Sequence, residues 1–207
     1  MTLDPADFVA AIDNPFWPLP THSRWSYVET DASGNEQQIV VEATGDTRQI
    51  LGISATVVHD QASEDGEIVE DTFDWYAQDS AGNVWYMGED TKEYENGQVV
   101  STEGSWEAGV DGALPGIVMP ADPTPGMTYR QEFYAHHAED VAIVLSLDEQ
   151  VALDARSYAG VLMTRETTAL EPDLVELKFY APGVGLVLEL GLSPELTRSQ
   201  LVQLDLP

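Results

Sequence analysis

From Arg24 to the end of the chain, apolar and polar residues alternate with a period of two, and short turn sequences interrupt the alternation. Asp31-Ala-Ser-Gly-Asn35, Ala81-Gly-Asn83 and Asn96-Gly97 have the composition of hairpin turns. About a dozen strands joined by hairpins form an antiparallel meander, and a sheet of that length must curl or split. The pattern predicts one mainly β domain over 1–207, folded as a barrel, a half-barrel or a two-layer sandwich.

The predicted strands share this alternation and are bounded by turn residues. They cover residues 25–29, 37–43, 49–59, 67–78, 84–87, 99–102, 127–134, 141–147, 158–168, 174–181, 185–190 and 197–206.

Three segments depart from the alternation. Residues 5–13 are predicted to form a short N-terminal helix, capped by Asp4 and started by Pro5. Residues 14–20 hold three prolines and cannot pair inside a sheet, so their aromatic and aliphatic side chains are expected to plug one end of the core. Residues 104–126 are rich in glycine and proline, which predicts a long ordered loop or a partial strand.

The net charge of the chain limits the classes of partner that it can bind. The sequence has 37 Asp and Glu against 8 Lys and Arg, for a net charge of -29. Nucleic acid and anionic membrane surfaces are therefore excluded as direct partners, and no apolar run reaches the ~20 residues of a spanning helix. Such acidity is typical of a salt-adapted or exported protein with a solvated acidic surface. The alternative is that some carboxylates converge on a cation, most plausibly Ca²⁺.

The sequence contains no cysteine. This excludes disulfides, thiolate zinc sites, iron–sulfur clusters and thiol catalysis. It leaves the cellular compartment open.

Three stretches carry a resemblance to known proteins. Residues 70–79 read EDTFDWYAQD, residues 82–86 read GNVWY and residues 104–112 read GSWEAGVDG. Together they resemble a group of uncharacterised exported bacterial β-rich proteins. The resemblance implies a β-fold and an extracytoplasmic location, and it transfers no catalytic residues. The first residues lack the basic start of a signal peptide, so the protein is either cytosolic or preceded by an export segment outside this sequence, and we expect the second.

The strand predicted over 67–78 carries the first candidate site. Glu70, Asp74 and Tyr76 share one face of this strand, opposite the face of Trp75. If the polar face looks outward, it is ordinary solvated surface. If it lines a barrel lumen, Glu70 and Asp74 are candidate catalytic acids about 14 Å apart, and Trp75 and Tyr76 are candidate ligand contacts.

The second candidate site lies in residues 131–140. His137 shares its strand parity with Met127, Tyr129 and Phe133, which predicts that it faces the core and adds it to the catalytic candidates. The candidate metal ligands of this stretch are His136, Glu139 and Asp140. The alternative is a polar hairpin tip in which both histidines are solvated.

The third candidate site is the glycine-rich loop with Trp106, Glu107 and Asp111. A flat aromatic face beside carboxylates suits a cationic or sugar-like ligand. The alternative is a loop packed as a plug over the mouth of the barrel.

These features support three functions. The first is an exported β-barrel-like protein that binds a small molecule, amphipathic or cationic, without a cofactor other than a possible Ca²⁺. The second is a small acid–base enzyme that uses lumenal Asp, Glu and His. The third is an acidic, cation-screened structural domain without a ligand. No nucleophile elbow, phosphate-binding loop or EF-hand spacing is present to decide between them.

Overall fold

The computed structural model describes residues 3–154 and 156–207, and these form one 16-stranded antiparallel sheet. The elements are η1 (Pro5–Asp7), β1 (Phe8–Val9), β2 (Arg24–Asp31), β3 (Glu36–Ile50), β4 (Ile53–Glu64), β5 (Glu67–Asp79), β6 (Val84–Glu95), β7 (Gln98–Ser101), β8 (Trp106–Glu107), β9 (Leu114–Met119), β10 (Thr128–Arg130), β11 (Glu132–Phe133), β12 (Asp140–Ala152), β13 (Ser157–Thr168), β14 (Val175–Ala181), β15 (Gly185–Ser193) and β16 (Thr197–Asp205).

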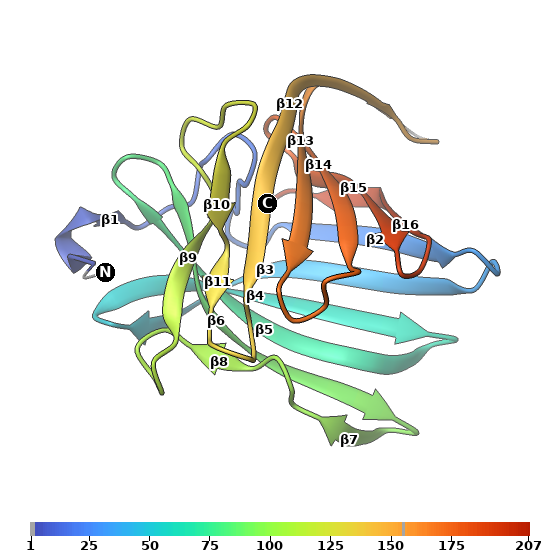
Figure 1. Ribbon diagram of the computed structural model, residues 1–207, viewed down its shortest axis with the longest axis horizontal. Helices are drawn as coiled ribbons and strands as arrows, with labels where there is room; N and C mark the ends of the chain where they lie inside the picture. The colour runs from blue at the N-terminus through green and yellow to red at the C-terminus, as the bar shows by residue number, and fades with distance from the viewer. Residues whose placement is uncertain (1–2, 155) are drawn as a thin grey trace.

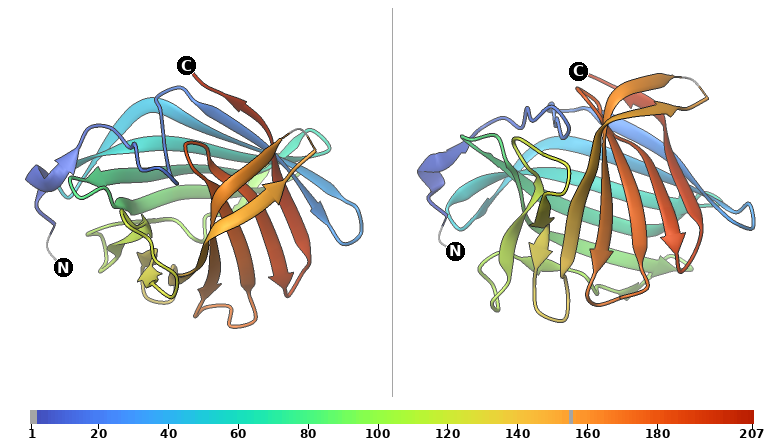
Figure 2. Two further views of the ribbon diagram at one scale, coloured as in Figure 1. Left: turned by 90° about the horizontal axis from the view of Figure 1, so that it is seen from above. Right: turned by 45° about the horizontal axis from the view of Figure 1, so that its top comes forward.

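The sheet curls into a nearly closed barrel (Figures 1 and 2). Its strand order is β10-β12-β13-β14-β15-β16-β2-β3-β4-β5-β6-β9-β11. The two end strands, β10 and β11, follow each other in the sequence with Gln131 between them. Gly116 of β9 lies against this junction, because a Cβ added to it would stand 2.3 Å from the carbonyl carbon of Gln131. The prediction of a mainly β fold curled into a barrel is confirmed.

The N-terminal segment lies across one end of the barrel (Figure 2). Gly183 N–H donates to the carbonyl of Pro15 at 2.7 Å, and the Asn14 side-chain amide donates to the carbonyl of Gly82 at 2.9 Å. The ring of Trp17 packs edge-on to Tyr76, with centroids 5.4 Å apart, and lies 5.7 Å from Tyr180. The proline-rich segment therefore packs against the core at this end.

The helix predicted over 5–13 is wrong. Only the single 3₁₀ turn η1 forms there, capped by Asp4, whose side chain accepts from Ala6 N–H. Phe8 and Val9 instead pair with the end of β5, opposite Asp79 and Gln78. The apolar stripe is too short to hold a helix against these backbone and side-chain contacts, so tertiary pairing overrides the local preference.

The strand predicted over 49–59 is also corrected. A tight turn at Leu51 and Gly52 divides it, and both residues have positive φ, 52° and 81°. β3 therefore continues to Ile50, and β4 begins at Ile53. A leucine rarely adopts this backbone region, so the sequence carries a weak signal for the turn.

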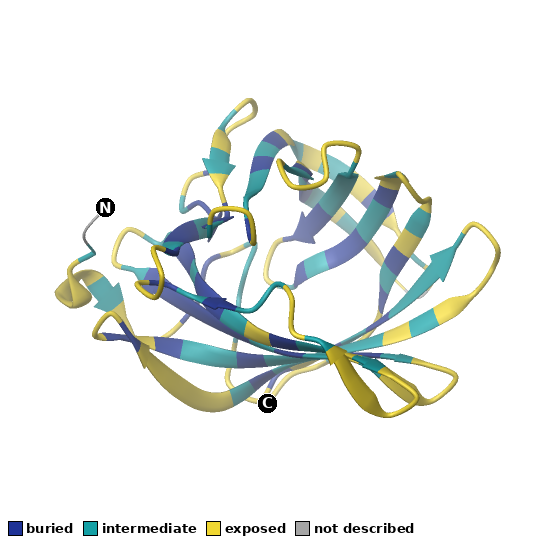
Figure 3. Cartoon of the chain, turned by 60° about the horizontal axis from the view of Figure 1, so that its bottom comes forward, coloured by how far each residue is buried: buried dark blue, intermediate teal, exposed yellow. Residues whose placement is uncertain are grey.

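Most buried residues lie on the strands of the barrel (Figure 3). The buried aromatic and aliphatic residues form three clusters, and the exposed residues concentrate at the hairpin tips. The β9 strand lies inside the segment predicted as a long loop or partial strand, and it pairs with β6. Of the residues that the structure describes, none belongs to a helix long and apolar enough to cross a membrane.

Candidate functional site

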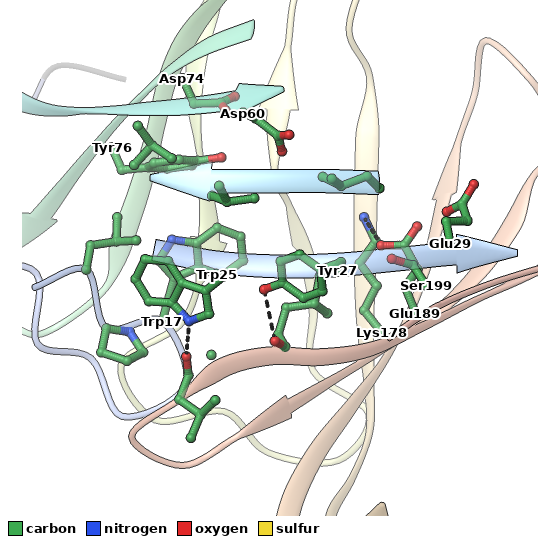
Figure 4. A pocket seen from close by; sticks show the side chains of 18 residues that line it. Trp17, Trp25, Tyr27, Glu29, Asp60, Asp74, Tyr76, Lys178, Glu189 and Ser199 are labelled. Carbon is green, nitrogen blue, oxygen red and sulfur yellow. Dashed lines mark hydrogen bonds and ion pairs between the residues drawn. The ribbon is translucent and has the colours of Figure 1, made fainter. Parts of the chain in front are cut away.

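A pocket of about 260 Å³ lies inside the barrel, which we call the lumen. It is enclosed by the N-terminal segment and by side chains of β2–β5 and β14–β16 (Figure 4). The lining residues are Trp17, Pro18, Leu19, Trp25, Tyr27, Glu29, Ile39, Val41, Val58, Asp60, Asp74, Tyr76, Lys178, Val184, Gly185, Leu186, Glu189 and Ser199. Trp17 and Trp25 lie toward the N-terminal segment, Lys178 and Glu189 lie near Glu29, and Asp60 and Asp74 lie near Tyr76 (Figure 4).

The aromatic end of the pocket is held in place by hydrogen bonds to the backbone. Trp25 and Tyr27 are two residues apart on β2, so both side chains point to the inner face of the sheet. The Trp25 indole N–H donates to the carbonyl of Val184 at 2.8 Å, and the Tyr27 hydroxyl donates to the carbonyl of Leu186 at 3.0 Å. These bonds fix the two rings as a rigid apolar surface, and rigid aromatic surfaces lose little conformational entropy when they receive a ligand.

Trp17 adds an unused donor to this end. Its indole N–H is buried and has no hydrogen-bond partner among the described residues. Buried donors are normally paired in native proteins, so an unpaired donor on a pocket wall calls for an explanation.

The neighbouring strands β4 and β5 carry two carboxylates that line the pocket, Asp60 and Asp74, and we call this pair the acid wall. Asp74 is 8% exposed, and the Tyr86 hydroxyl donates to its Oδ1 at 2.5 Å. Asp60 receives no hydrogen bond from any residue that the structure describes. Burial, followed by the charges of Asp74 and Glu70, raises the pKa of Asp60 well above its ordinary value.

The acid wall continues away from the pocket through β6. Glu89 stands directly opposite Asp74 in the register of the two strands. Burial and then the charge of Asp74 raise the pKa of Glu89, and burial also raises the pKa of Asp74. Beyond them lies Glu132, whose Oε2 accepts from the Trp106 indole N–H at 3.0 Å. Burial and then the charge of Asp140 raise the pKa of Glu132 to about 8.

A different arrangement surrounds Lys178, which carries the one positive charge among the described residues that line the pocket. Its ammonium lies 3.3 Å from Glu166, 3.5 Å from Glu176 and 3.5 Å from Glu189. We call these four residues the lysine centre. Burial alone would raise the pKa of Glu166, but Lys178 and three side-chain hydrogen bonds hold it below its ordinary value. Those bonds come from Gln131, Thr164 and Tyr180.

The register explains why the lysine centre and Glu29 meet on one face. Lys178, Glu189, Ser199 and Glu29 are successive cross-strand partners on β14, β15, β16 and β2. Residues directly opposite each other on antiparallel strands point to the same side of the sheet. The row therefore faces the lumen as a unit.

Only some of the predicted site residues of β5 line the pocket. Asp74 and Tyr76 line the pocket, so the polar face of β5 looks into the lumen and not outward. Glu70 is exposed, and its Oε1 accepts from the Thr72 hydroxyl at 3.1 Å. Trp75 lies on the opposite face of the strand, buried in the core with the Arg48 guanidinium 4.1 Å from its ring centroid.

The glycine-rich loop contributes no lining residue to this pocket. Trp106 is 5% exposed and packs edge-on to Tyr86. Glu107 accepts a hydrogen bond from Arg48 Nε at 3.0 Å. Asp111 lies in an exposed turn with a φ of 49°. These positions match a packed segment better than a ligand-facing flap.

The prediction that His137 faces the core is wrong. β11 ends at Phe133, and a tight turn follows in which His137 N–H donates to the carbonyl of Tyr134 at 2.8 Å. The turn ends the strand parity, so His137 is exposed and stacks on the Tyr134 ring, with centroids 4.4 Å apart.

The predicted metal ligands lie at the same turn. Glu139 Oε1 accepts from the backbone N–H of His136 at 2.8 Å, and Asp140 begins β12. Within residues 3–154 and 156–207, no group of three or more His, Cys, Asp or Glu side chains is arranged to hold a metal ion.

Sequence reasoning missed most of the pocket, although the strands contained signals for it. Lys178 and Glu189 are charged residues inside the otherwise apolar runs Leu177 to Ala181 and Leu186 to Leu190. Trp25, Tyr27 and Glu29 occupy one face of a single strand. A charged residue on the apolar face of a strand was the signal that could have identified the lumen.

No protein-family model matches the chain, and no curated protein matches it in sequence. Solved structures match its fold. A protein of Bacteroides fragilis, assigned as exported and with a YmcC-like fold, aligns with a TM-score of 0.53 and 14% identity, over 92% of this chain and 99% of that chain. A protein of Parabacteroides distasonis, assigned as a lipoprotein, aligns with a TM-score of 0.50 and 11% identity, over 93% of this chain and 99% of that chain. At these identities the likeness concerns the fold alone.

Proposed function

We propose that this protein is an exported small-molecule-binding protein and that its lumenal pocket takes a small amphipathic cation. The observation that carries the proposal is the acid wall. Asp60 lines the pocket with no hydrogen-bond donor from the described residues, and it lies in the same cross-strand row as Trp25, with Val41 between them. A partly buried carboxylate without a partner is costly unless a ligand supplies one.

The chemistry of the two ends defines the ligand class. The apolar end favours an aliphatic or aromatic body, and the carboxylates favour an ammonium group on it. The descriptions of the two structurally similar proteins as exported and as a lipoprotein support the proposed location outside the cytoplasm.

A pocket with an unpartnered carboxylate supports binding over a purely structural role. The acid–base enzyme is less well supported, because His137 lies in an exposed turn and does not line the pocket. Asp74 alone of the three catalytic candidates lines it.

The test uses three probes of nearly equal shape and different charge: 2-phenylethylammonium, 2-phenylethanol and phenylacetate. Isothermal titration calorimetry at neutral pH should show affinity in the order cation, alcohol, anion. Binding that is independent of charge, or that favours the anion, would contradict the proposal.

The variant Asp60→Asn tests whether the ammonium probe binds in the lumenal pocket. It should weaken binding of the ammonium probe by about tenfold or more, which corresponds to about 1.4 kcal/mol. The matched control is Asp65→Asn in the exposed turn of the same β4–β5 hairpin. It removes the same charge outside the pocket and should leave the affinity unchanged. Equal losses in the two variants would show a diffuse effect of net charge.

A further inference from the structure

The two carboxyl groups of the acid wall and that of Glu89 lie on the same face of three adjacent strands. Asp74 and Glu89 are direct cross-strand partners on β5 and β6, and Asp60 on β4 lies diagonal to Asp74, because Asp74 pairs with Val58. Direct partners place their Cβ atoms about 5 Å apart, and diagonal neighbours about 7–8 Å apart. Asp74 is 8% exposed, so little solvent screens these charges from one another.

The groups that face these carboxyls do not neutralise them. β5 adds Glu70 and Tyr76, β6 adds Tyr86, and β11 adds Glu132, all of which are acidic or neutral. From β14, the ammonium of Lys178 is shared by the three glutamates of the lysine centre. From β2 and β15, Glu29 and Glu189 are further acids on the pocket wall.

The nearby basic residues lie on the other face of the sheet. His59 binds Asp71 at 2.6 Å, and Lys92 pairs in register with Asp71. His59 adjoins Asp60 in sequence, and Lys92 is three residues from Glu89, so both side chains point away from the acid wall.

We propose that the pocket exchanges a proton for its cationic ligand. The empty pocket holds a proton on the carboxyl groups of Asp60, Asp74 and Glu89, and the ammonium of the ligand displaces it to solvent. This inference rests on the proposed function, since it concerns the same pocket. In the exchange, one carboxyl O–H bond breaks and the ammonium pairs with the resulting carboxylate, so the charge of the pocket is conserved.

The electrostatics of the three carboxyl groups favours this exchange. Like charges at these separations in a buried site cannot all ionise, and burial raises the pKa of each of the three carboxyl groups. The ammonium of the ligand removes that repulsion and makes ionisation favourable. By linkage, affinity for the cation rises with pH, by up to about tenfold per pH unit for each proton released.

Calorimetry measures the exchange directly. 2-Phenylethylammonium keeps its charge up to about pH 9, as a lysine side chain does. Its apparent binding enthalpy is measured at one pH near neutrality in phosphate, imidazole and Tris buffers, which differ in their enthalpy of ionisation. The slope of apparent enthalpy against the buffer's ionisation enthalpy is negative when protons are released to the buffer, and its magnitude is their number. We expect a slope of about −0.5 to −1. A slope of zero with measurable binding would overturn the exchange and leave the proposed function standing.

A pair of variants locates the proton. Glu89→Gln removes the like charge opposite Asp74, and Glu89 is not itself a lining residue of the pocket, so the variant should reduce proton release by half or more while the probe still binds. Glu95→Gln, at the exposed end of the same strand, should release as many protons as the wild type. Undiminished release in Glu89→Gln would overturn the assignment to these carboxyls. Absence of probe binding in the wild type at every pH would instead refute the proposed function.

Discussion

Two groups of carboxylates share the lumen, and they differ in the hydrogen bonds and ion pairs that the chain gives them. In the lysine centre, Lys178 lies within 3.5 Å of three glutamates, and Gln131, Thr164 and Tyr180 occupy the oxygens of Glu166. In the acid wall, Asp60 has no donor from the described residues, and Asp74 has one from Tyr86. The first group is complete within the chain. The second lacks positive charge, and we therefore assign ligand binding to it.

The largest expected effect is the loss of the lysine centre. Lys178→Met keeps the length of the side chain and leaves Glu166, Glu176 and Glu189 without their cation. Removing one partner of a buried ion pair costs about 3–5 kcal/mol, so the free energy of unfolding should fall by about 3 kcal/mol or more. Urea denaturation at neutral pH measures it.

Lys92→Met is the matched control, because Lys92 pairs with the exposed Asp90 at 3.0 Å. Surface pairs contribute about 0–1 kcal/mol. If both lysine variants lose the same small amount of stability, the distinction between the two regions fails.

Asp60→Asn should change stability in the opposite direction. It removes a carboxylate that no described residue binds by a hydrogen bond or an ion pair, so the free energy of unfolding at pH 8 should rise by about 1 kcal/mol. The same urea experiment, with Asp65→Asn beside it, provides the comparison. A loss of stability in Asp60→Asn would mean that Asp60 is structural and has an internal partner.

The pH dependence of stability is a smaller effect with a fixed sign. Burial raises the pKa of Glu132 to about 8, above the ordinary value near 4.3 of an unfolded chain. Between these values the folded protein binds more protons than the unfolded chain, so stability is present at low pH and is lost as pH rises through the folded pKa. The unfolding midpoint should therefore be higher at about pH 5.5 than at about pH 8.5.

Glu132→Gln should flatten this profile, while Trp106 keeps an acceptor in the amide oxygen. Glu103→Gln, which is exposed, should leave its slope unchanged. A midpoint that is flat or that rises over this range would contradict the burial of an uncompensated carboxyl group.

Much of the fold could be predicted from the sequence, because alternation is a local property of a strand. The predicted strand over 67–78 corresponds to β5, and that over 158–168 corresponds to β13. The errors arose where tertiary contacts override local preference. Pairing of Phe8 with Asp79 replaced the expected helix, and Leu51 adopts a turn conformation that its side chain does not favour.

The candidate site was less predictable for a physical reason. Parity shows that Asp74 and Tyr76 share a face, but it cannot show whether this face looks inward, because that depends on how the sheet closes. Lys178 and Glu189 come near Asp60 only because β14 and β15 curl round to face β4. Trp75 was predicted as a ligand contact from its place on the candidate strand, and Trp106 from its ring in a glycine-rich loop, and both are buried in a core cluster outside the pocket.

The central claim is that the acid wall binds a cation whose body rests against the aromatic end of the pocket. A crystal structure of the protein with 2-phenylethylammonium tests it most directly. The account predicts the ammonium within hydrogen-bond distance of Asp60 and the ring against Trp25 and Tyr27. An empty pocket at saturating probe, or a ring bound with its ammonium turned away from Asp60, would contradict it.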